Sequence, residues 1–156
     1  EAALQSYGQA LALFRQVGDR LGEANVLKAI GDVQQFRADR EAALQSYGQA
    51  LALFRQVGAR LGEANVLLSM GDLLRRRQDY TQAWQCYVQA QQNYTMIGDI
   101  YSQARVLYRM GDALVEQERR SEAIALYEEA IARWRSIGMT DLVNNILIPR
   151  LQRARQ

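Results

Sequence analysis

The string EAALQSYGQALALFRQVG fills residues 1–18 and recurs without a change at residues 41–58. Chance does not produce two identical strings of 18 residues in one chain, so the sequence is a tandem array with a period of 40 residues. In such an array each unit buries its apolar face on its neighbours, and there is no single central core. The same period sets the boundaries of the other units.

The 40-residue frame divides the chain into five segments. Residues 18–57, 58–97 and 98–137 are three full units. Residues 1–17 are the second half of a unit, and residues 138–156 are a divergent terminal segment. Because the chain begins inside a unit, we expect it to be a piece of a longer protein.

Each full unit is expected to form two helices and no strand, which makes the fold an all-α solenoid of about eight helices. In the first unit Leu21, Ala24, Leu27, Ile30 and Val33 stand three residues apart, the spacing of an apolar helix stripe. Residues 44–54 carry a second stripe of this kind. The terminal segment is expected to be one helix, residues 139–155, that covers the last unit.

Three sets of residues predict how these helices begin, end and cross. Asp39 and Asp79 are suitable N-caps, and Gln82 completes a capping box with Asp79. A glycine suited to a left-handed C-terminal cap ends each second helix: Gly18, Gly58, Gly98 and Gly138. A further glycine recurs within each first helix, at Gly31, Gly71 and Gly111, where it predicts a close crossing against the small residues Ala43, Ala83 and Ala123. In the terminal segment the frame places Leu151 at this position and Pro149 interrupts the helix, so we expect no second helix to pack there.

Composition argues against several classes of function. The net charge of +2 gives no broad basic surface for nucleic acid, and no apolar run approaches the ~18 residues of a membrane helix. There is no histidine, and the single Cys86 cannot form an internal disulfide or a cysteine zinc site. We therefore expect no enzyme activity, no cofactor and no metal, and a reducing, cytoplasmic location.

The repeating residues resemble the motif of the tetratricopeptide repeat family. That motif has a large residue, then a hydrophobic residue followed by glycine, then a small residue, an aromatic residue and another small residue at set offsets. The three units supply Leu27, Ile30-Gly31, Ala43, Tyr47 and Ala50; Leu67, Met70-Gly71, Ala83, Tyr87 and Ala90; and Leu107, Met110-Gly111, Ala123, Tyr127 and Ala130. The period of 40 differs from the usual 34, and it is similar to that of Pins/LGN-type adaptors and of bacterial signalling arrays.

This resemblance implies a right-handed superhelix whose first helices line a concave groove for a peptide. Carried over position by position, the groove residues are Asn25, Lys28, Asp32 and Gln35; Asn65, Leu68, Asp72 and Arg75; Arg105, Tyr108, Asp112, Val115 and Glu116; and Asn145 and Ile148. Among them Tyr108 is the best candidate for an anchor, because an aromatic residue is less needed for packing at a groove position. The alternative is a solvated face on which Asp72 pairs with Arg105 and Asp32 with Asn65.

The three groove aspartates stand where the family's chaperone-binding clamp has asparagine. A row of carboxylates would repel an acidic C-terminal tail of the chaperone type, so a partner with arginine, lysine or backbone amides is expected instead. The basic run at residues 75–77 and Arg150, Arg153 and Arg155 are interpreted as structural cations near helix ends. Trp84 and Trp134 are assigned to the core, and Cys86 is expected to be inert.

Two functions follow from the sequence. The first is a scaffold that binds a protein or peptide in the groove. The second is a self-assembling module, head-to-tail or swapped, in which a homo-oligomer forms through the repeat ends. Its open surface would be the apolar face of the opening half unit: Leu4, Tyr7, Leu11 and Phe14.

Overall fold

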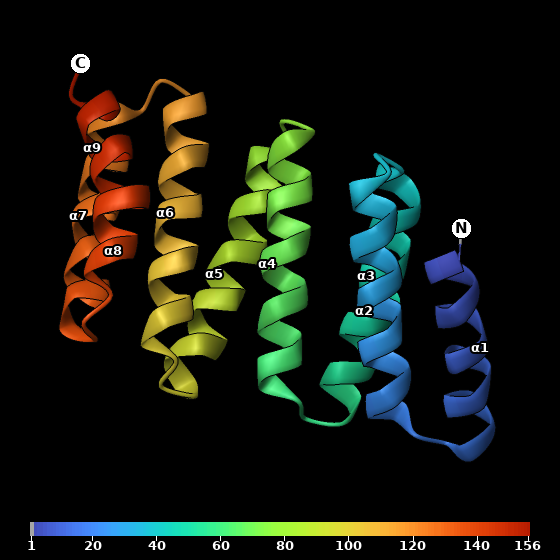
Figure 1. Ribbon diagram of the computed structural model, residues 1–156. Helices are drawn as coiled ribbons and strands as arrows, with labels where there is room; N and C mark the ends of the chain where they lie inside the picture. Colours follow the sequence, from blue (N-terminus) through green and yellow to red (C-terminus); the bar gives the residue numbers. More distant parts are fainter. Residues whose placement is uncertain (1) are drawn as a thin grey trace.

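The computed structural model describes residues 2–156, and over this range seven long helices precede a shorter, interrupted one (Figure 1). The long helices are α1 (Ala2–Val17), α2 (Arg20–Phe36), α3 (Arg40–Gln56), α4 (Arg60–Arg76), α5 (Tyr80–Met96), α6 (Ile100–Glu116) and α7 (Arg120–Ser136). The last is built from α8 (Thr140–Leu142), the π-helical turn η1 (Val143–Leu147) and α9 (Ile148–Ala154). No strand occurs in residues 2–156, so the all-α prediction is confirmed.

The helices form antiparallel pairs that stack side by side. The strongest contacts join α2 to α3, α4 to α5 and α6 to α7, and weaker contacts link each pair to the next first helix. Figure 1 shows α2, α4, α6 and α9 in one layer, with α3, α5 and α7 behind them. Each pair matches one 40-residue unit, as expected of a tetratricopeptide-type solenoid.

The turns after the second helices depend on glycine. Gly18, Gly58, Gly98 and Gly138 all have positive φ, between +70° and +75°, which confirms the predicted left-handed caps. The turns after the first helices use the same conformation without glycine. Ala38, Gln78 and Glu118 have φ of 62°, 65° and 62°, so these turns carry a backbone strain that the sequence did not reveal.

The predicted N-caps hold only in part. The Asp39 side chain accepts a hydrogen bond from the Ala42 N–H, whereas Asp79 makes no such bond, so the capping box with Gln82 is wrong. Two caps were missed, because Asp19 and Asp99 cap α2 and α6. In the equivalent position before α4, Ala59 has no side chain that could accept the bond.

The glycines within the first helices face a tyrosine ring, not the predicted alanine. A Cβ on Gly31, Gly71 or Gly111 would lie 2.5–2.6 Å from the Cε1 atom of Tyr47, Tyr87 or Tyr127, in that order. Ala43, Ala83 and Ala123 are buried nearby, but it is the tyrosine that requires the absence of a side chain. Gly22 and Gly62 clear space in the same way for Phe14 and Phe54.

The C-terminal helix avoids the break that the sequence predicts at Pro149. The π-helical turn η1 comes directly before α9, and Pro149 lies in the first turn of α9, where its missing N–H is tolerated. The π-turn contains one residue more than an α-helical turn, so the residues after it are shifted by one position relative to the 40-residue frame. Leu151 therefore does not take the place of Gly111: like Met110, it is 7% exposed and packs back onto the preceding helix pair.

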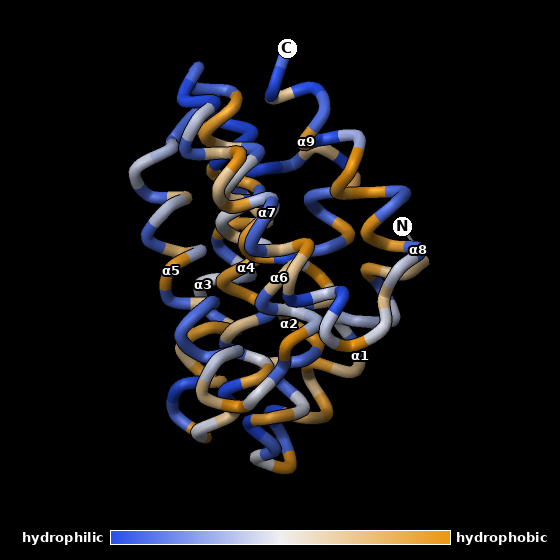
Figure 2. Tube along the Cα trace, turned by 90° about the vertical axis from the view of Figure 1, so that its left-hand side faces the viewer, coloured by the Kyte–Doolittle hydropathy of each residue, from blue (hydrophilic) through white to orange (hydrophobic). Residues whose placement is uncertain are grey.

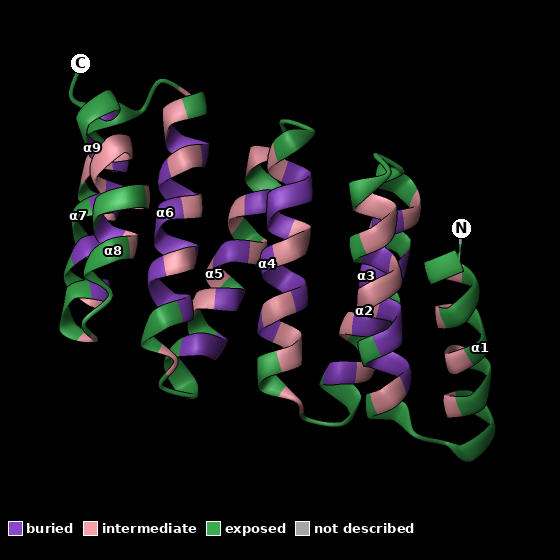
Figure 3. Cartoon of the chain, in the orientation of Figure 1, coloured by how far each residue is buried: buried purple, intermediate pink, exposed green. Residues whose placement is uncertain are grey.

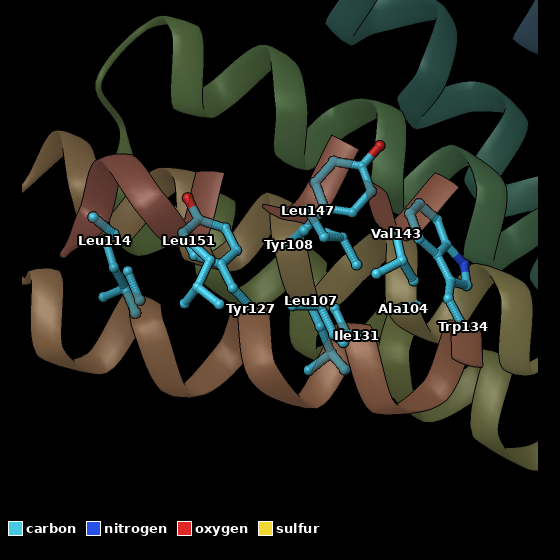
Figure 4. Packing of buried hydrophobic residues seen from close by; sticks show 13 residues of the cluster. Ala104, Leu107, Tyr108, Leu114, Tyr127, Ile131, Trp134, Val143, Leu147 and Leu151 are labelled. Carbon is cyan, nitrogen blue, oxygen red and sulfur yellow. The ribbon is translucent and has the colours of Figure 1, made fainter. Parts of the chain in front are cut away.

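The core is divided into three clusters, one for each helix pair and the first helix that follows it. Apolar residues recur among polar ones along the helices (Figure 2), and in α2 to α7 the buried residues are mostly apolar. Figure 4 shows the last cluster, in which Val143, Leu147 and Leu151 close the pair α6–α7. None of the helices in residues 2–156 combines the length and the hydrophobicity of a membrane span.

Two segments with the same sequence have very different surroundings. In α3, Tyr47 and Phe54 are at most 1% exposed, because α2 and α4 enclose the helix. No residue of α1 is buried, since α1 packs against α2 on one side only (Figure 3). Burial in this array is therefore set by neighbouring helices and not by the helix's own sequence.

Candidate partner-binding face

The first helices approach one another more closely than the second helices do. Contacts join α2 to α4 and α4 to α6, whereas contacts between successive second helices are weaker. We call the layer of α2, α4, α6 and α9 the inner face (Figure 1). Most of the predicted groove residues lie on these helices.

A carboxylate–phenol pair recurs on this face. Asp32, Asp72 and Asp112 each accept a hydrogen bond, 2.8 Å long, from the tyrosine 15 residues later in the same unit. These are the tyrosines for which the glycines clear space: Tyr47, Tyr87 and Tyr127. One side of each aspartate is therefore occupied by its own unit.

The other side of each aspartate binds a cation. Arg109 Nη1 lies 2.8 Å from Asp72 Oδ2, and Lys28 Nζ lies 2.6 Å from Asp32 Oδ2. Asp112 binds both Nε and Nη2 of Arg150, at 2.9 Å and 3.2 Å. For Asp72 and Asp112 the cation comes from the next unit, so the pair also fastens two units together.

These contacts correct the predicted pairing and the predicted charge of the face. Asp72 pairs with Arg109 and not with Arg105, which lies over the Tyr101 ring. Asp32 pairs with Lys28 and not with Asn65, which accepts a hydrogen bond from the Tyr94 hydroxyl. The row of carboxylates is neutralised, so the physical reason for excluding an acidic partner no longer holds.

One pocket gathers part of the predicted site. It has a volume of about 290 Å³ and is lined by Arg75, Asp112, Val115, Glu116, Tyr127, Arg150, Arg153 and Ala154. Four of these residues were predicted as groove residues, and Arg75 binds Glu116 across the gap between α4 and α6. The interpretation of Arg150 and Arg153 as structural cations missed their place in the pocket.

Two predicted groove residues are part of the core. Leu68 and Tyr108 are 4% and 7% exposed. Tyr108 packs against Trp134 with ring centroids 5.7 Å apart, and the guanidinium of Arg150 lies over its ring, 4.9 Å from the ring centroid. Tyr108 thus lies in the cluster that the C-terminal helix closes, and its ring is not open at the surface as the prediction of an anchor requires (Figure 4).

The remaining predicted residues are spread over the face. Asn25 and Asn65 line a separate pocket at the turns before the first helices, and Ile148 lines one between α7 and α9. Gln35 Oε1 lies 2.8 Å from the Tyr47 hydroxyl as an alternative acceptor to Asp32 for its single proton, and Asn145 is exposed. The structure thus does not bring the predicted groove residues together in one site.

The residues of the half unit and the predicted core aromatics differ in how far they are buried. Leu4, Tyr7, Leu11 and Phe14 on α1 are only partly covered. Trp134 is 1% exposed, as expected of a core residue, and Trp84 packs partly buried against two clusters. Burial raises the pKa of the Cys86 thiol, which disfavours the reactive thiolate.

Burial also controls the ionisation of the tyrosines. It raises the pKa of Tyr94 to about 12. For Tyr47, Tyr87 and Tyr127 burial is the largest cause of a still higher pKa, and the neighbouring aspartate adds to it. The phenols are therefore fixed as hydrogen-bond donors over the physiological range of pH.

The chain belongs to the tetratricopeptide repeat family, since a family model described as tetratricopeptide repeat matches residues 1–56 and 62–136. Repeats of this family generally mediate protein–protein interactions and are not catalytic units. A search of curated proteins found no match.

Proposed function

We propose that this chain is a scaffold that holds a segment of another protein on its inner face, with the pocket between α4, α6, α7 and α9 as the main contact. The observation that carries the proposal is this pocket, to which three successive first-helix positions contribute side chains. Val115 and Ala154 are its apolar lining residues, and the other six are polar or charged. This combination suits one side chain with an apolar stem and a polar end.

The charges favour an acidic group in the partner. Arg75, Arg150 and Arg153 line the pocket together with only two carboxylates, Asp112 and Glu116. Both carboxylates already bind an arginine of the pocket, so they do not attract a cation from outside. Arg153 remains exposed at the rim, and its Nε donates only to the Pro149 carbonyl, at 3.2 Å.

A peptide-display experiment tests the proposal. The immobilised chain is screened with random peptides whose ends are blocked, and the bound peptides should be enriched in aspartate or glutamate. Arg153→Glu and Val115→Glu should abolish binding. Arg120→Glu is the matched control, because Arg120 is exposed and does not line the pocket. Equal binding by the pocket variants and the control would refute the proposal.

A second candidate function is self-association through α1. It is favoured by the difference between α1 and α3, whose shared sequence buries Tyr47 and Phe54 completely in α3 but leaves α1 without a buried residue. Leu4→Glu with Leu11→Glu should then lower the molar mass measured by light scattering. Unchanged mass in this variant, with association retained, would exclude α1 as the contact.

A further inference from the structure

One long edge of the solenoid carries exposed apolar side chains at a 40-residue interval. Val17, Val57 and Ile97 stand at the C-terminal ends of α1, α3 and α5, directly before the glycine of each turn, and are 74%, 41% and 41% exposed. The equivalent Ile137 after α7 is partly buried against the last cluster. The second residue of the following first helix is Leu21, Leu61 or Tyr101, at 47%, 52% and 39%. We call the six exposed residues the turn ridge; its turns lie along the lower edge of Figure 1.

The opposite edge is charged. Its turns contain Arg37 and Asp39 after α2, Arg77 and Asp79 after α4, and Glu118 and Arg119 after α6. Phe36, at 92% exposure, is the only exposed large apolar side chain at these turns in residues 2–156. The two edges repeat with the same period, so their contrast is a property of the unit and not of one position.

The turn ridge is shaped to receive a side chain. A pocket of about 540 Å³ opens between its first and second units, with Leu21 on one side and Leu61 on the other. Ile97, at the third turn of the ridge, and Phe54 also line it. The ridge therefore offers both projecting apolar side chains and a hollow that could hold one.

The charges beside the turn ridge are balanced within the chain. Arg15 binds Glu23 and Arg55 binds Glu63, and Asp19 and Asp99 cap the helices that follow them. An anionic membrane surface would need an excess of basic side chains here, and a strongly charged partner would need an excess of the opposite sign. The surface therefore fits a partner surface that is apolar and whose positive and negative charges are also balanced.

We propose that the turn ridge binds the turn ridge of a second copy of this chain, the two running antiparallel about a two-fold axis. A second copy has the same spacing between its apolar residues. The apolar residues at every turn of one ridge can therefore contact those of the other ridge at the same time. The six side chains expose on the order of 500 Å² of apolar surface, which with a polar rim approaches the ~800 Å² that each partner contributes to a standard interface. This contact differs from the inner-face pocket and from the open face of α1.

Light scattering over a hundredfold range of concentration, on a size-exclusion column, tests the proposal. The wild-type mass should rise toward that of two chains, and Leu21→Glu with Leu61→Glu should remain a monomer throughout. Both substitutions lie in the first turn of a helix, where glutamate is tolerated, so the variant should keep the helical circular dichroism of the wild type.

Two control variants separate this contact from the alternatives. Phe36→Glu removes a more exposed apolar side chain from the opposite edge and should dimerise like the wild type. Leu4→Glu with Leu11→Glu lies on α1, outside the turn ridge, and should also dimerise. A wild-type chain that stays monomeric at every concentration would overturn the proposal. So would a dimer that survives in the turn-ridge variant or is lost in the α1 variant alone.

Discussion

Arg150 binds Asp112 with two nitrogens, Nε at 2.9 Å and Nη2 at 3.2 Å, although the two residues are 38 positions apart. Arg109 makes the equivalent contact to Asp72 from 37 positions away. The extra residue is accounted for by the π-helical turn η1, which shifts everything after it by one position. Without that turn the 40-residue frame would place Pro149 where Arg150 now stands.

Replacing Asp72 should be far more costly than replacing Asp32. Asp72→Ala leaves the Tyr87 hydroxyl and Arg109 without their partner in a buried setting, and we expect a loss of about 2–4 kcal/mol in the free energy of unfolding. The Asp32 side chain is 44% exposed, so Asp32→Ala should lose about 1 kcal/mol or less. Urea unfolding followed by circular dichroism measures both; equal losses would contradict this account.

Replacing two of the glycines with alanine should change the free energy of unfolding in opposite directions. In Gly71→Ala the new Cβ would lie 2.5 Å from the ring of Tyr87, which is fully buried and cannot move aside, and a loss of about 1–3 kcal/mol is expected. Gly48 lies within α3, and no neighbouring atom comes within 4 Å of the place its Cβ would take, so Gly48→Ala should gain about 0.5–1 kcal/mol of helix propensity. Thermal unfolding of the two variants gives both signs, and a stabilised Gly71→Ala would disprove the tyrosine contact.

A missing helix cap can be restored at Ala59. The equivalent Asp19 accepts a hydrogen bond from the Gly22 N–H at 2.8 Å, and Ala59 has similar backbone angles. Ala59→Asp should add about 1 kcal/mol, which raises the melting temperature by roughly 2–4 °C. Asp19→Ala is the reciprocal control and should lower it. No gain in Ala59→Asp would mean that the first turn of α4 is already satisfied.

The fold should be lost in alkali. The unfolded chain releases its phenol protons near pH 10, while burial raises the pKa of Tyr94 to about 12 and those of Tyr47, Tyr87 and Tyr127 further. The stabilisation is therefore complete below about pH 10 and declines as the pH rises, by up to about 1.4 kcal/mol per pH unit for each tyrosine. Tyrosinate absorbance and loss of helix should rise together between about pH 10 and 12. Ionisation of these phenols in a chain that keeps its helices would contradict the prediction.

The candidate site was less predictable than the fold, for reasons visible in single residues. Asp72 and Asp112 were placed on the inner face by the resemblance to the tetratricopeptide repeat family, whose groove positions they match. Their partners were not, since Arg109 was not among the groove positions and Arg150 is displaced by a π-turn that no local pattern announces. Tyr108 was assigned to the groove by its position, but the C-terminal helix buries it.

The helix pairs, their 40-residue period and the glycine caps could be predicted from the sequence, because these depend on side-chain spacing and on backbone conformation within a few residues. Tertiary structure alone decided which of these helices are buried and which charges are free. The identical segments of α1 and α3 show why: the same side chains are enclosed in one and partly exposed in the other. Burial and ion pairing are properties of neighbouring helices, and in a solenoid each helix acquires its neighbours only when the units stack.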